Sequence, residues 1–221
     1  MSPLEVLWQY REAFFNGFVV TLQLLALSSL IGTCIGVSLE WLCQQLEGGT
    51  RRTIDVISFC ISTIPALVLL FWLYYPAQAL LDISVSPFWT ATVALVLLNT
   101  FAVYRISADA IRDFPNQYNA TALVCGLKPL QITRYIQAPL LLRAALPRWI
   151  DQQAVVLQTS VFASLISVDE IFRAAQRINS VAYQPVVIYT SMALIFLLTA
   201  GSAMYGARYL RSKFHRDFSE R

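Results

Sequence analysis

Residues 16–37 read NGFVVTLQLLALSSLIGTCIGV, and this stretch decides the fold class. It lies within an uncharged run, residues 13–39. A helix needs roughly 20 apolar residues to cross a hydrocarbon core of about 30 Å, and this run is long enough. The helices of soluble proteins carry a charged face toward water, which this run lacks. The stretch therefore predicts a membrane-spanning helix and argues against a soluble globular domain.

Four more uncharged runs follow along the chain, and only 13% of all residues are charged, against about a quarter in an average soluble domain. The runs are residues 56–81, 83–104, 152–168 and 178–207. Three of them reach the length of a span, whereas 152–168 is slightly short and rich in Gln and Ser. We therefore expect an all-α integral membrane protein, a single transmembrane domain over residues 1–221 with five transmembrane helices. The expected spans lie near residues 14–42, 54–80, 87–112, 146–167 and 183–209.

Two local patterns predict how these spans pack and bend. Gly32 and Gly36 form a GxxxG pair, which lets a neighbouring helix approach closely. Pro65 lies inside the second span, where a proline removes a backbone hydrogen bond and often kinks the helix. The fourth span carries Gln, Thr and Ser side chains, so it is expected to face protein or a water-filled path.

The basic residues indicate the orientation. With the N-terminus outside and the C-terminus inside, 13 of the 16 lysines and arginines fall on the inner side of the membrane. Loops on the cytoplasmic side carry the excess of basic residues, so this orientation is expected. A long connection, residues 113–145, is then cytoplasmic, and residues 168–180 form an external amphipathic helix. Ser167 and Glu170 have the spacing of a capping box at its start.

The residues that catalytic and metal sites need are scarce. His215 is the single histidine, and the cysteines at 34, 43, 60 and 125 show no CxxC spacing. The sequence contains no P-loop pattern GxxxxGK[ST] and no basic patch interleaved with aromatic residues. We therefore expect no catalytic residue, no metal site and no nucleic-acid partner.

The cytoplasmic connection combines helix and turn signals. Pro115 suits the first turn of a short helix expected over residues 116–125. Gly126 can end that helix in a left-handed conformation, and Pro129 cannot continue it. This arrangement fits an ordinary solvated connection, or a docking element that carries a push from a soluble partner into the bundle.

The stretch ATALVCGLKPLQITRYIQAP, residues 120–139, resembles the EAA loop of the membrane subunits of bacterial ABC importers. Gly126 and Pro139 keep the Gly-to-Pro spacing of that loop, and Ala122 stands at its second alanine. The first span and residues 157–180 are similar to the permeases for polar amino acids. The resemblance implies the type I ABC importer permease fold.

The resemblance also implies the partners. A cytosolic ABC ATPase dimer would dock on the loops, a second permease half would complete the pathway, and a periplasmic or lipid-anchored binding protein would deliver an amino acid or related small polar solute. A heterodimer is favoured over a homodimer. The chain would be no enzyme and would hold no cofactor, because ATP and Mg would bind the ATPase, and it would lie in the bacterial cytoplasmic (inner) membrane. The coupling residues would be Asn116, Gln117, Asn119, Ala120, Thr121, Ala122, Leu123, Gly126, Leu127 and Pro139.

The chain departs from the family pattern at charged positions. Ala120 stands where the loop has its glutamate, and Leu157-Gln158 replaces a Lys-Asp pair. Two functions therefore stay open: a permease half that contacts solute, and a degenerate structural partner that couples to the ATPase without contacting it. The candidate residues of the solute pathway are Asn99, Asp151, Gln158, Thr159 and Ser160.

Overall fold

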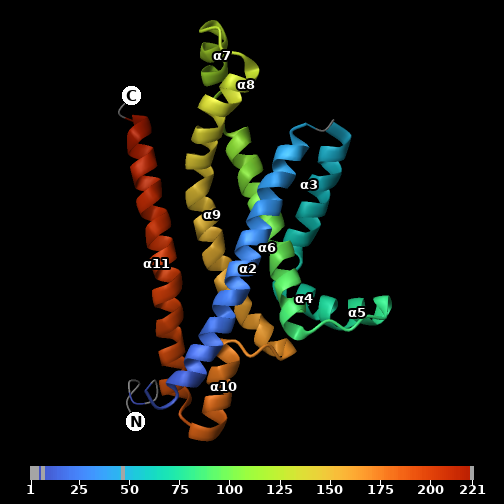
Figure 1. Ribbon diagram of the computed structural model, residues 1–221, viewed down its shortest axis with the longest axis vertical. Helices are drawn as coiled ribbons and strands as arrows, with labels where there is room; N and C mark the ends of the chain where they lie inside the picture. Colours follow the sequence, from blue (N-terminus) through green and yellow to red (C-terminus); the bar gives the residue numbers. More distant parts are fainter. Residues whose placement is uncertain (1–4, 6–7, 46–47, 220–221) are drawn as a thin grey trace.

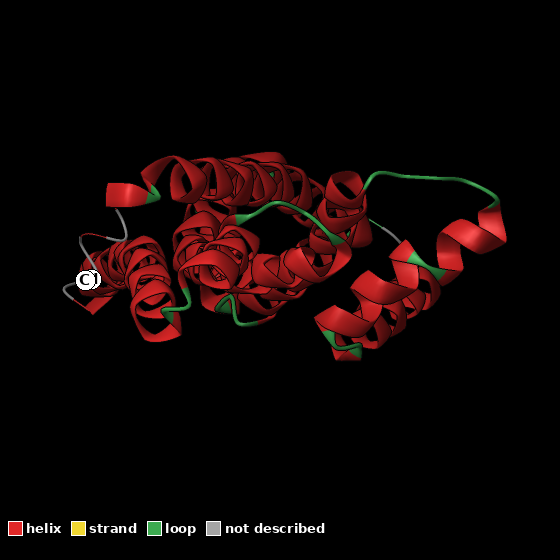
Figure 2. Ribbon diagram, turned by 90° about the horizontal axis from the view of Figure 1, so that it is seen from below, coloured by secondary structure: helices red, strands yellow, loops and turns green. Residues whose placement is uncertain are grey.

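The computed structural model describes residues 5, 8–45 and 48–219, and all of its regular elements in these ranges are helices (Figures 1 and 2). Four long helices run along the molecule: α2 (Arg11–Cys43), α6 (Pro87–Arg112), α9 (Ala138–Ser160) and α11 (Pro185–Ser219). Helix α2 begins at one end of the molecule, and α11 ends at the opposite end (Figure 1). Within the described ranges, three helices are long and apolar enough to cross a membrane, or up to five if each of two bent pairs is one span. The expected all-α architecture is confirmed.

Helices α2 and α6 form the centre of the bundle, and glycines set how closely they pack. A Cβ atom built on Gly36 would lie 2.5 Å from the carbonyl oxygen of Thr100. One built on Gly32 would lie 2.8 Å from Nδ2 of Asn99. Real Cβ atoms essentially never come this close. The backbone of α6 therefore occupies the space beside Gly36, and the side chain of Asn99 occupies the space beside Gly32, which is the close approach that the GxxxG spacing predicts.

The second span is broken rather than kinked. It consists of α3 (Gly48–Thr63), α4 (Ala66–Tyr74) and α5 (Pro76–Leu81). The axis turns by 95° between Thr63 and Ala66. Pro65 has no N–H to donate and disfavours helical geometry at the residue before it, which explains why the break falls here. The expected single helix over residues 54–80 is therefore wrong in shape, since α4 and α5 lie across the direction of α3 (Figure 1).

Polar contacts tie α3 to the central pair. Arg51 donates from Nη2 to Oε1 of Glu40 on α2 at 3.2 Å, and the Glu40 side chain is buried. The hydroxyl of Tyr104 on α6 donates to Oδ1 of Asp55 at 2.7 Å. These two contacts hold the half of the broken span that lies away from Pro65.

The connection between α6 and α9 is mostly helical. It contains α7 (Asn116–Val124), α8 (Pro129–Ile132) and a π-helical turn, η1 (Thr133–Gln137), that leads directly into α9. Helix α9 thus begins at Ala138, well before the start near residue 146 expected for the fourth span. It ends in a 3-10 helix, η2 (Val161–Ile166). The α7–α8 tip is therefore joined to α9 without an extended linker (Figure 1).

Helix α10 (Ile171–Ala182) is amphipathic and packs its apolar face against α2 and α11. The predicted capping box is wrong: Ser167, with φ of 74°, closes η2, and Glu170 is itself the N-cap. The Glu170 carboxylate accepts a hydrogen bond from the backbone N–H of Arg173 at 2.9 Å. Asp169 forms an ion pair with Arg173, at 3.3 Å, and a second one with Arg177, at 3.2 Å.

Candidate functional site

A cavity of about 340 Å³ lies where the broken span meets α6 and α9. The break contributes residues 62–66 to its wall, α6 contributes Leu95, Leu98 and Ala102, and α9 contributes a face that includes Gln152 and Thr159. Leu98 lies near the middle of α6, so the cavity is at about half the depth of the bundle. Non-helical backbone at this depth of a membrane is tolerated where it is buried in protein or lines a water-filled cavity.

Two of the five predicted pathway residues lie at this cavity or beside it. Thr159 lines the wall, and its hydroxyl donates to the carbonyl of Val155 at 2.8 Å. Ser160 is buried in the adjoining narrow space between α4, α6 and α9, and its hydroxyl donates to the carbonyl of Leu157 at 2.7 Å. Asp151 and Gln158 do not line the cavity, so their assignment to the pathway stays a prediction.

Asn99 is the fifth predicted pathway residue, and the structure places it inside the helix packing. Its Nδ2 donates to the carbonyl of Ser28 on α2 at 3.0 Å and to Oε1 of Gln153 on α9 at 3.3 Å. Gln153 also donates to the carbonyl of Trp149 at 2.9 Å. Asn99 is completely buried, so these contacts give it a role in joining α2, α6 and α9.

Three polar residues that line this cavity were not predicted from the sequence: Gln152, Ser62 and Thr63. Gln152 and Thr159 are seven residues apart on one helix, which is about two turns, so they share a face. That spacing was a signal available in the sequence. Ser62 and Thr63 reach the cavity only because the chain turns at Pro65, and the angle of that turn is a property of the folded bundle.

The α7–α8 tip presents apolar side chains to its surroundings. Val124 is 89% exposed, Leu130 is 79% exposed and Leu123 is 59% exposed. Gly126 has a φ of 78° and ends α7 in the expected left-handed conformation, where a Cβ atom would meet nothing within 4 Å. Exposed apolar side chains gathered at one tip are typical of a surface that binds another protein.

The other predicted coupling residues are distributed over the same tip. Ala122 is buried, Leu127 is half-buried, and Gln117, Ala120, Thr121 and Pro139 are exposed. The backbones of Asn116 and Asn119 belong to α7, and their side chains lie outside the described part of the structure. A small cavity of about 110 Å³ separates the base of α7 from α9, and there Arg148 approaches Asp113 to 4.0 Å.

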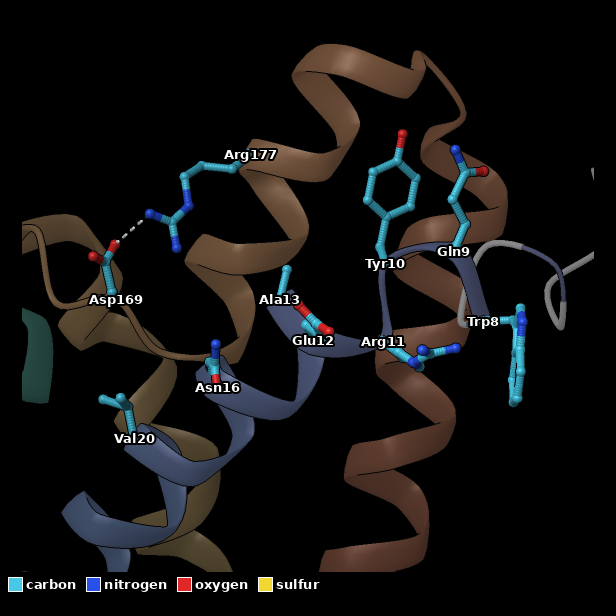
Figure 3. A pocket seen from close by; sticks show the side chains of 11 residues that line it. Trp8, Gln9, Tyr10, Arg11, Glu12, Ala13, Asn16, Val20, Asp169 and Arg177 are labelled. Carbon is cyan, nitrogen blue, oxygen red and sulfur yellow. Dashed lines mark ion pairs between the residues drawn. The ribbon is translucent and has the colours of Figure 1, made fainter.

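A wider cavity, of about 840 Å³, opens at the opposite end of the molecule, between the start of α2 and α10 (Figure 3). Its wall carries charges of both signs, from Arg11, Glu12, Asp169 and Arg177. The ion pair between Asp169 and Arg177 crosses from the η2–α10 connection to α10 (Figure 3). The guanidinium group of Arg11 lies 4.7 Å from the centre of the Trp8 ring.

Glu170, next to this wide cavity, predicts a pH dependence of stability. Burial raises the pKa of its carboxyl group to about 7, more than the backbone N–H groups of Phe172 and Arg173 lower it. The folded protein thus keeps a proton that the unfolded chain releases near pH 4.5. The stability that this proton provides is present below pH 4.5 and is lost as the pH rises through about 7.

We expect the variant Glu170→Gln, which mimics the protonated form, to lack this loss. Its free energy of unfolding should match that of the original protein at pH 4 and exceed it at pH 8, by roughly 3 kcal/mol. Thermal unfolding of the two proteins at both pH values measures the difference. Equal melting temperatures at pH 8 would contradict the shifted pKa.

Comparison with known proteins agrees with the fold. The chain is similar to the arginine ABC transporter permease protein ArtQ of Haemophilus influenzae, with 26% identity over 94% of this chain and 96% of the relative. It is also similar to the histidine/lysine/arginine/ornithine transport system permease protein HisM of Escherichia coli K12, with 27% identity over 88% of this chain and 89% of that one.

Solved structures share the arrangement of the helices. The crystal structure of an amino acid ABC transporter with histidines matches 96% of this chain and 99% of its own chain, with a TM-score of 0.87 and 21% identity. An inward-facing MetNI methionine ABC transporter matches 90% of this chain and 95% of its own, with a TM-score of 0.74 and 18% identity. These matches show the permease fold of ABC transporters. Residues 32–215 match the family described as binding-protein-dependent transport system inner membrane component, and the chain therefore belongs to that family.

Proposed function

We propose that this chain is the permease subunit of an ATP-driven ABC importer for amino acids, and that it forms half of the solute pathway in the bacterial cytoplasmic membrane. The observation that carries the proposal is the cavity at the break of the second span, at half the depth of the bundle. The printed names of the relatives, which are permeases for arginine and for histidine, lysine, arginine and ornithine, support amino acids as the solutes.

The ATPase docks on the α7–α8 tip in this proposal. The exposed apolar residues of the tip offer it a contact surface, and the continuous path through η1 into α9 would carry a displacement into the wall of the cavity. ATP and Mg bind the ATPase, and this chain holds no cofactor. The tip then faces the cytoplasm, and the start of α2 faces the outside.

The wide cavity at the outer end is where a periplasmic or lipid-anchored binding protein releases solute. Its charges of both signs suit a polar partner surface, and the long helix α2 leads from this cavity toward the interior of the bundle. We call the cavity at the break of the second span the inner cavity. A second permease half faces its open side and completes the pathway.

A heterodimer remains favoured over a homodimer, with this chain in one of two roles. In the first, it contacts solute through the inner cavity. In the second, it is a degenerate structural partner that couples to the ATPase and leaves solute contact to the other half. The polar lining from Gln152 and Thr159 favours the first role, because a purely structural interface gains nothing from polar groups directed into a cavity.

Filling the inner cavity tests the proposal. In the variant Thr159→Phe, the ring would enter the cavity and narrow it beside the break, so ATP-driven amino acid uptake should fall at least tenfold. The complex is purified with its ATPase and binding protein and reconstituted in vesicles for the measurement. The matched control is Thr190→Phe, at an exposed position of α11 that does not line the cavity, and its uptake should stay within twofold. Unchanged uptake by Thr159→Phe would favour the structural role.

A further inference from the structure

We infer that the inner cavity selects an amino acid with an uncharged polar side chain, and that Gln152 is the residue that bonds this side chain. The inference rests on the proposed function, because it takes the cavity as part of the solute pathway. It adds the class of solute, which neither the family nor the proposed pathway assigns.

The neutral wall of the inner cavity disfavours a solute with a charged side chain. All the residues that line the inner cavity are uncharged. Its polar members are Ser62, Thr63, Gln152 and Thr159, and the others are apolar. A cationic or anionic side chain would lose its hydration there without gaining an opposite charge from this chain, which is costly in a site of low polarity. The α-ammonium and α-carboxylate groups are common to all amino acids and balance each other, so discrimination falls on the side chain.

The polar side chains of the wall differ in whether their hydrogen-bonding groups are free to bind a solute. The hydroxyl of Thr63 donates to the carbonyl of Phe59 at 2.7 Å, and that of Thr159 donates to the carbonyl of Val155. Their protons are therefore engaged within their own helices. The Ser62 hydroxyl and the Gln152 amide form no hydrogen bond with any other described residue, and of these two groups the amide has the greater number of donor hydrogens. An amide offers both donors and an acceptor, so it complements a side chain that carries an amide or a hydroxyl group.

The two charged residues nearest to the wall in sequence, Asp151 and Arg105, do not belong to it. Asp151 precedes Gln152 and lies one turn before Val155, but it does not line the cavity. Arg105 is exposed near the tip end of α6 and also lies outside the wall. The relatives are named for solutes such as arginine and lysine, whose side chains are cationic. The neutral wall of this chain offers such a side chain no opposite charge.

Binding of labelled L-glutamine and L-arginine to the purified permease–ATPase complex tests the inference. The binding protein is left out, so that its own selectivity does not enter. We expect the original complex to bind glutamine at least tenfold more tightly than arginine. Gln152→Glu should reverse this preference, because the new carboxylate supplies the missing opposite charge. Gln152→Leu should weaken glutamine binding about tenfold without improving arginine binding. The control is Gln176→Glu, an exposed position on α10 outside the wall, which should keep the original preference.

The outcomes separate a failure of the solute assignment from a failure of the proposed function. Equal or tighter binding of arginine by the original complex would overturn the inference, as would a preference that Gln152→Glu leaves unchanged. A complex that binds neither amino acid but imports amino acids with its binding protein would place recognition elsewhere, and would overturn the inference while the proposed function stands. A complex with its binding protein that imports no amino acid at all would overturn the proposed function itself.

Discussion

Replacing Gly36 with alanine should destabilise the bundle severely, and replacing it with leucine should prevent assembly. The added Cβ atom would lie 2.5 Å from the carbonyl oxygen of Thr100, 2.9 Å from Cβ of Val103 and 3.1 Å from the backbone nitrogen of Tyr104. Two of these three neighbours are backbone atoms of α6, which no change of rotamer can move. The helices can accept the methyl group only by moving apart.

Separation of α2 from α6 would also weaken the contacts that depend on their closeness. Asn99 reaches the carbonyl of Ser28 across this interface, and Tyr104 reaches Asp55 beside it. Overpacking of a well-packed core costs typically 1–3 kcal/mol, and we expect Gly36→Ala at the upper end of this range. The melting temperature of the detergent-purified protein measures the loss, and the yield from membranes measures the failure of Gly36→Leu.

Gly201→Ala is the matched control for this prediction. Gly201 lies on α11, and a Cβ atom there would meet nothing within 4 Å. The control should melt within a few degrees of the original protein, since it adds the same methyl group without a collision. A Gly36→Ala protein that melts together with the Gly201→Ala protein would show that α2 and α6 do not need this close approach.

The main lines of the fold could be predicted because a membrane excludes charge. Each uncharged run in the sequence corresponds to a helix or a bent pair of helices in the structure, and the small pair Gly32 and Gly36 indicated which face of α2 packs closely. The break at Pro65 could be predicted only as a kink. A proline shows that a hydrogen bond is missing, but the 95° angle depends on how α4 packs against α6.

The candidate site was harder to predict because a polar side chain within a span can either join neighbouring helices or line a cavity. Asn99 and Thr159 look alike in sequence as polar residues among apolar ones. The first is bonded to two neighbouring helices, and the second lies at a cavity. Spacing can likewise mislead at helix ends: Ser167 and Glu170 have the separation of a capping box, yet Glu170 caps α10 alone. Only the three-dimensional arrangement separates these cases.

Replacing Gly126 with valine should uncouple ATP hydrolysis from transport while the bundle remains intact. Gly126 has a φ of 78°, which a β-branched residue adopts only at a considerable cost. The turn after α7 depends on this conformation, because Leu127 donates its N–H to the carbonyl of Ala122 at 3.1 Å and Gly126 donates to that of Leu123 at 3.0 Å. A strained turn would change the direction of α7 relative to α8, and with it the surface that meets the ATPase.

The surroundings of Gly126 separate this effect from a loss of stability. A Cβ atom there meets no neighbour within 4 Å, so valine introduces no collision and acts through the backbone alone. We therefore expect membrane insertion and the melting temperature to stay unchanged, basal ATPase activity of the assembled complex to stay within about twofold, and solute uptake to fall tenfold or more. ATP hydrolysis and solute uptake, measured in the same reconstituted vesicles, give the amount of ATP hydrolysed per solute imported.

Gly126→Asn is the matched control, since asparagine adds a side chain but tolerates the left-handed conformation. If coupling requires the left-handed conformation of residue 126, the asparagine variant should transport nearly as well as the original protein, and the valine variant should not. If both variants lose uptake, the side chain itself obstructs the ATPase, and the tip is a contact surface in which the turn has no special part. If both keep uptake coupled to hydrolysis, the assignment of Gly126 to coupling is wrong, and the ATPase must act through another part of the chain.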